Sequence, residues 1–173
     1  MDSKFSGRYL NVYFDKKADE IRALVEKWLH EMDVKIEPMR ETELAFGFVV
    51  DDPQGKMVLV FQPLQHTDVV IMETGFEFPE QYLKRLSTQE ASTRNGLLWD
   101  LYFTVLDTQL AFEMKGTPPK SVVLRTAIYS DALTKDRFIQ EFTRIRRGLL
   151  KVLWTIEREL NRQVPAGKQA YIG

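Results

Sequence analysis

Few ionisable side chains in this sequence stand at spacings that support catalysis or metal binding. The two histidines, His30 and His66, lack a second histidine at the HxH or HxxxH spacing that presents two imidazoles to one metal ion. Glu73 and Glu77 fall on one face of a predicted strand, because alternate residues of a strand point the same way, and we expect this face to be solvated. We therefore predict no metal site, no cofactor and no catalytic residue.

The larger signatures of enzymes are also missing from the sequence. It has no cysteine, which excludes thiolate catalysis, cysteine-type zinc sites and iron–sulfur clusters. It contains no GxSxG motif, no Walker-type glycine loop and no GxGxxG motif. These absences favour a non-enzymatic protein. An enzyme or small-ligand binder whose site forms only in three dimensions is the alternative.

A row of positive charges lies near the C-terminus. Four of its residues recur every seven positions, so on a helix they share one side, and a fifth lies near them. They are Arg137, Arg144, Lys151 and Arg158, with Arg147 nearby. The row either binds the phosphates of a nucleic acid or forms a solvated flank among interspersed glutamates. The chain has 24 basic and 25 acidic residues and a net charge of −1, and this balance makes nucleic acid the less favoured partner.

The same C-terminal segment predicts a helix that is apolar on two sides. One stripe faces the core and comprises Phe138, Phe142, Ile145, Leu149, Val152, Ile156 and Leu160. A second set projects on a different side and comprises Ile139, Leu150, Leu153 and Trp154. This set packs either against the first helix or against another chain, and we predict it as the interface of a homodimer, the commonest oligomer. Gly148 costs about 1 kcal/mol relative to alanine within a helix, and it would let another backbone approach.

Apolar periodicity predicts the order helix, three strands, helix pair, two strands, long helix. The predicted helices cover residues 16–32, 78–86, 87–109 and a last segment ending near 161; the strands cover 43–52, 56–62, 68–78, 110–114 and 121–129, with 34–39 as an optional edge strand. Short connections favour antiparallel pairing. The predicted fold class is α+β, with an antiparallel sheet of about five strands packed against helices.

Three local predictions accompany this order. Asp15 caps the first helix, so the first dozen residues form a tail or a short strand. Ser87 and Glu90 form a capping box at the start of the helix over 87–109. Thr134 or Asp136 opens the last helix.

The helix over 87–109 has one wide apolar face and is expected to be largely buried; this face comprises Leu97, Leu98, Leu101, Tyr102, Val105 and Leu106.

The length of 173 residues fits a single domain over residues 1–173, with the first dozen residues and residues 163–173 as flexible tails. The N-terminus lacks the apolar core of a signal peptide. No window approaches the roughly 18 apolar residues of a membrane-spanning helix. We therefore expect a cytoplasmic protein without a membrane partner.

The element order over residues 15–161, with a long amphipathic helix after a final pair of strands, resembles the type III secretion chaperone-like fold. That superfamily includes bacterial secretion chaperones and YbjN-like proteins, and the chain also looks like an uncharacterised archaeal family of unknown function. The resemblance implies a homodimer without cofactors that binds an extended partner segment by strand addition and in apolar pockets. It implies no site residue. Because the chain is longer and less acidic than the secretion chaperones, a general partner-binding or regulatory role is expected.

Overall fold

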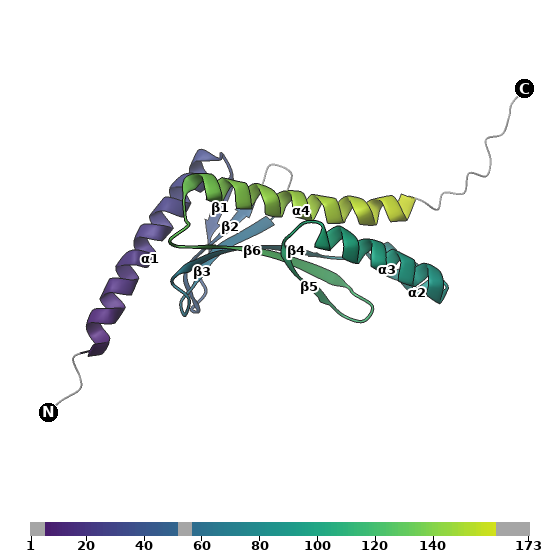
Figure 1. Ribbon diagram of the computed structural model, residues 1–173, viewed down its shortest axis with the longest axis horizontal. Helices are drawn as coiled ribbons and strands as arrows, with labels where there is room; N and C mark the ends of the chain where they lie inside the picture. The colour runs from purple at the N-terminus through teal and green to yellow at the C-terminus, as the bar shows by residue number, and fades with distance from the viewer. Residues whose placement is uncertain (1–5, 52–56, 162–173) are drawn as a thin grey trace, which may run out of the picture. The chain divides into compact units, whose positions relative to one another are not determined.

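The computed structural model describes residues 6–51 and 57–161, with side chains from residue 17 onward. Within these residues the order of elements is α1 (Ser6–Glu31), β1 (Lys35–Pro38), β2 (Leu44–Asp51), β3 (Met57–Pro63), β4 (Val69–Glu77), α2 (Glu80–Thr88), α3 (Ala91–Leu106), β5 (Ala111–Lys115), β6 (Ser121–Tyr129) and α4 (Lys135–Asn161) (Figure 1). The strands form one sheet in the order β1-β2-β3-β4-β6-β5. The predicted α+β antiparallel fold is confirmed, and the edge strand β1 makes it a sheet of six strands instead of about five.

The chain divides into two compact units. Unit 1 comprises Met1–Thr74 and Arg125–Ile145, and unit 2 comprises Gly75–Leu124 and Arg146–Gly173. The strands β4 and β6 and the helix α4 therefore contribute residues to both units.

The core of unit 1 is built on the two-residue period of its strands. Phe48 of β2 lies opposite Val60 of β3, which lies opposite Met72 of β4, and all three side chains are buried. The neighbouring row points to the other face of the sheet, with Leu59 between Val49 and Glu73, and its side chains are only half-buried. One face of these strands is thus the core face.

Helices α1 and α4 contribute apolar side chains to the core of unit 1. Helix α1 contacts β1 and β2, and it buries Val25, Trp28 and Leu29. The Trp28 ring lies 5.5 Å from the Phe138 ring of α4, and Phe138 is 6.3 Å from Phe142 one turn later. These ring contacts join the first helix to the start of the last helix.

Unit 2 packs α2 and α3 with the second part of α4. Phe78 lies 5.6 Å from Tyr82 with their rings edge to face, and both side chains are buried, so this corner is packed. The hydroxyl groups of Thr104 in α3 and Thr155 in α4 are 3.3 Å apart. Asp107, just after α3, pairs with Lys151 of α4. These two polar contacts hold α3 against α4.

The predicted start of the first helix is wrong. Helix α1 begins at Ser6, and Asp15 lies inside it instead of capping it. Residues 8–31 contain neither proline nor glycine, so no helix-breaking residue prevents the helix from extending past Asp15 toward the N-terminus. The predicted tail is therefore helical from Ser6, while residues 1–5 and 163–173 lie outside the described part of the chain.

The predicted capping box before α3 is also wrong, while the predicted start of α4 is confirmed. Helix α2 continues to Thr88, and the Ser87 hydroxyl donates to the Lys84 carbonyl of that helix at 2.7 Å. Glu90 precedes α3 without a side-chain capping bond. At α4, the backbone N–H of Arg137 donates to the Thr134 hydroxyl oxygen at 3.2 Å, which is N-cap geometry.

Two strand glycines allow the packing of each unit to be tested. A Cβ at Gly75 would lie 2.7 Å from the backbone oxygen of Val122. A Cβ at Gly47 would meet side-chain atoms only, at 2.9 Å from Cδ1 of Leu44 and at 3.0 and 3.1 Å from Sδ and Cβ of Met39. We expect Gly75→Ala to lower the free energy of unfolding by about 1–3 kcal/mol, because backbone cannot move aside. Gly47→Ala is the matched control and should cost less. Urea unfolding would measure both, and equal losses would contradict the expectation.

Candidate functional site

The ionisable residues singled out by the sequence do not assemble into a catalytic site within residues 6–51 and 57–161. His30 is exposed at the end of α1, and His66 lies in the turn after β3. No group of three or more metal-ligating side chains occurs among the described residues. Glu73 is occupied by Arg125 of β6, whose Nη2 lies 2.5 Å and whose Nε lies 2.8 Å from the same carboxylate oxygen. Glu73 is therefore one half of an exposed ion pair.

The buried tyrosine of unit 2 is unsuited to proton transfer at neutral pH. Burial, together with the nearby Glu159 carboxylate, raises the pKa of Tyr82 to about 12. The neutral hydroxyl is favoured because ionised oxygen is poorly solvated there. Tyr82 therefore stays protonated and serves the packing of α2.

A shallow groove lies on the open face of unit 1. It measures about 210 Å³ and is lined by Met39, Glu41, Glu43, Leu44, Leu59, Phe61 and Glu73. Glu41 and Glu43 are exposed to water, and Glu73 is already paired with Arg125. The groove offers an apolar floor with solvated carboxylates at its rim, which is weak recognition chemistry by itself.

In unit 1 the predicted cationic row surrounds a buried carboxylate. Glu141 of α4 is only 2% exposed, and it lies 2.8 Å from Arg137 and 2.5 Å from Arg144. The Thr126 hydroxyl of β6 donates to the same carboxylate at 2.7 Å. Three partners compensate the desolvated charge, so the two arginines act in the fold.

In unit 2 two further members of the row also pair with carboxylates. Lys151 pairs with Asp107, and the Nε of Arg158 lies 3.2 Å from a carboxylate oxygen of Glu159. Arg147 is exposed on the same helix. Paired cations release fewer counterions from a polyanion than free ones, so this arrangement favours the solvated-flank interpretation of the row.

The second apolar set of α4 differs in burial from residue to residue. Ile139, in unit 1, is half-buried. In unit 2, Leu150 and Leu153 are half-buried, while Trp154 is 64% exposed. We call Leu150, Leu153 and Trp154 the α4 strip. Its assignment as an interface stays a prediction.

The expectation that Gly148 admits another backbone is wrong. A Cβ at Gly148 would lie 2.6 Å from Cδ1 of Leu110 and 3.5 Å from Cδ1 of Leu124, so the space is filled by side chains of unit 2. Gly148 is buried on the core side of α4. It therefore serves packing within the chain and contributes nothing to the α4 strip.

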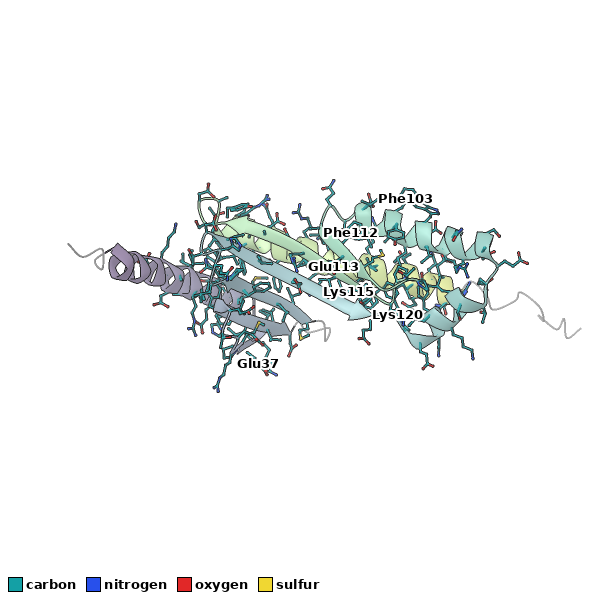
Figure 2. All side chains as sticks on the ribbon, turned by 90° about the horizontal axis from the view of Figure 1, so that it is seen from below. Glu37, Phe103, Phe112, Glu113, Lys115 and Lys120 are labelled. Carbon is teal, nitrogen blue, oxygen red and sulfur yellow. The ribbon has the colours of Figure 1, made fainter. Side chains whose placement is uncertain are left out.

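Helix α3 departs most from its prediction, because apolar side chains on its outer side stay exposed. Leu97, Leu101 and Val105 are buried, as expected. The opposite side carries what we call the α3 ridge: Trp99, Phe103 and Leu106, which are 61%, 62% and 57% exposed. Figure 2 shows Phe103 pointing away from the other elements of unit 2. Helix α3 is therefore covered on one side and is not largely buried.

The signal for the α3 ridge was present in the sequence. At about 100° per residue, Trp99, Phe103 and Leu106 share one side, roughly opposite the stripe of Leu97 and Leu101. The predicted wide face included Leu106 but neither Trp99 nor Phe103, so this second apolar side was not recognised. What periodicity does not reveal is which side has neighbours.

Comparison with known proteins supplies a family and a fold. The model of an uncharacterized conserved protein family, DUF2299, matches residues 21–156. The chain belongs to the DUF2299 family. It is also similar in structure to an uncharacterized protein from Methanothermobacter thermautotrophicus, with a TM-score of 0.75 and 20% sequence identity over 80% of this chain and 98% of that one. No curated protein matches the chain. Among the described residues of this DUF2299 protein, no helix is long and apolar enough to span a membrane.

The structural role of the cationic row in this DUF2299 protein can be tested at Glu141. Glu141→Gln keeps the side-chain volume but removes the charge that Arg137, Arg144 and Thr126 contact. We expect a loss of about 1.5–3 kcal/mol in the free energy of unfolding, the range for hydrogen bonds to a charged group. Glu157→Gln, at an exposed position of the same helix, should change it by less than about 0.5 kcal/mol. Equal effects in urea unfolding would refute a structural role.

Proposed function

We propose that this DUF2299 protein is a non-enzymatic, homodimeric protein-binding domain of the cytoplasm. The observation that carries the proposal is the exposure of large apolar side chains on two helices of unit 2. They are Trp99, Phe103 and Leu106 of α3 and Trp154 of α4, each more than half exposed. Exposed tryptophan and phenylalanine are typical anchors of protein interfaces, because they bury much area while losing little rotamer freedom.

The α4 strip is our candidate for docking a partner protein. Trp154 would be the anchor, since its exposed ring has apolar surface to lose on binding, and Leu150 and Leu153 would extend the contact. Arg147 and Glu157 are exposed on the same helix and would form a polar rim. An apolar centre with a polar rim is the ordinary anatomy of a protein interface.

A chaperone-like mode of binding is proposed for the sheet edge. Strand β5 ends the strand order, so one of its edges has no neighbouring strand among the described residues. Its exposed residues Ala111, Glu113 and Lys115 alternate with half-buried Phe112 and Met114 (Figure 2). An extended partner segment could add to this edge by main-chain hydrogen bonds, as the resemblance to secretion chaperones implies.

Nucleic-acid binding has less support than protein binding. Four cations of the row pair with carboxylates, at Glu141, Asp107 and Glu159. The net charge of −1 adds no general attraction for polyanions.

The partner-binding role is tested by capture from a lysate of the host, with identification of the captured protein. We expect wild-type protein to retain a specific partner and Trp154→Glu to lose it, because a charge at the anchor must be desolvated on binding. Leu64→Glu is the matched control, since Leu64 is 53% exposed in the turn after β3. Circular dichroism should show equal folding of all three proteins.

Two outcomes would reject this assignment. The first is the absence of any partner specific to the wild-type protein. The second is capture of the same partner by Trp154→Glu and wild type, which would remove the α4 strip from the proposal.

A further inference from the structure

The α3 ridge is the feature of the described chain that its own packing explains least. Trp99, Phe103 and Leu106 stand on the solvent side of a helix whose other side already supplies the core contacts of α3. The Trp99 ring lies 5.9 Å from Phe103 and 6.1 Å from Tyr102. Trp99 therefore contacts both neighbouring rings, and these side chains form a continuous apolar surface.

The charged residues of α3 indicate which classes of partner the α3 ridge can bind. Helix α3 has two charged residues, Arg94 and Asp100. Arg94 is half-buried and shares the side of Leu97 and Leu101. Asp100 is exposed and lies four residues after Gly96, at the flank of the ridge, so the exposed side has one carboxylate and no cation. Nucleic acids and anionic lipid surfaces attract helices with cationic flanks, which this side lacks. The ridge is complementary to an uncharged apolar surface, and the ridge itself is such a surface.

Gly96 is a second feature of α3 that indicates a binding partner outside the chain. A Cβ at Gly96 would meet no atom within 4 Å, so the fold of the single chain does not require glycine there. Glycine inside a helix nevertheless costs about 1 kcal/mol relative to alanine. Gly96 lies three residues before Trp99 and seven before Phe103, hence on the same side of the helix. A missing side chain on this side allows another helix backbone to approach closely.

We infer that the α3 ridge binds a second copy of this chain, with the two α3 helices crossing near Gly96. The Trp99 and Phe103 rings of each protomer then pack beside the crossing point against the other protomer. A two-fold axis places the same apolar side chains on both sides, with Asp100 of each protomer at the flank of the contact, and two-fold symmetry is the arrangement of most homodimers. This inference rests on the proposed protein-binding function and moves the self-association site from the α4 strip to α3.

The experiment is sedimentation equilibrium of the purified full-length protein from about 1 to 500 µM, the range of weak to moderate dimers. We expect wild type to dimerise reversibly. Phe103→Glu should raise the dissociation constant at least about 30-fold, as loss of an interface anchor does. Because Phe103 is exposed, thermal unfolding of the monomer should not change.

Gly96→Ala distinguishes an effect on the dimer interface from an effect on the stability of α3. Alanine should raise the thermal midpoint of the monomer, because it is the better helix former, and should raise the dissociation constant at least about tenfold, because its methyl group separates the helices. Thr93→Ala, at an exposed position of the same helix, is the control and should leave the dissociation constant unchanged. A purely local effect of Gly96 would stabilise the monomer without weakening the dimer.

Each other result overturns the inference. A wild-type protein that stays monomeric at every concentration does so and also removes the homodimer from the proposed function; if it still captures a partner through Trp154, the protein-binding role stands. Dimers that tolerate Phe103→Glu or Gly96→Ala also overturn it. If Trp154→Glu dissociates the dimer while Phe103→Glu does not, self-association belongs to the α4 strip.

Discussion

The register of β2, β3 and β4 is the constraint on which unit 1 depends. Phe48, Val60 and Met72 lie side by side in three neighbouring strands and are all buried. A slip of one residue would reverse the faces of a strand. In β4 it would turn Glu73 toward the core and separate it from Arg125, at the cost of desolvating a carboxylate. The core row and the ion pair thus specify the same register from opposite faces.

The first turns of α4 place the charged carboxylate of Glu141 in the core of unit 1. Glu141 accepts the Thr126 hydroxyl bond from β6, so the carboxylate orients the helix relative to that strand. Arg137 and Arg144 reach it from the turns before and after. Replacing such a cluster by apolar groups is often neutral for stability, and its value lies in fixing one arrangement. The cationic row therefore has a structural explanation at its first two positions.

In unit 2, some apolar side chains of α3 lie in the core and others are exposed to solvent. The stripe of Leu97, Leu101 and Val105 buries α3, while Trp99 and Phe103 increase the apolar area in water without adding to the core. A contiguous apolar patch on a protein surface is typical of a site that binds another surface. This division is why unit 2 bears the proposed interactions, whereas the groove of unit 1 has only solvated or paired carboxylates at its rim.

The sequence by itself determined the order of elements, the core stripe of α4, the two candidate starts of that helix at Thr134 and Asp136, and the membership of the cationic row, because each follows from local periodicity or capping. The tertiary structure alone decided what those side chains meet. Gly148 and Gly96 are both glycines inside amphipathic helices, yet one faces Leu110 and the other faces open space. Likewise, periodicity places Trp99 and Leu101 on opposite sides of α3, but only the packing of distant segments decides which side is covered. Burial is a property of neighbours brought together by long-range contacts, and local spacing does not specify them.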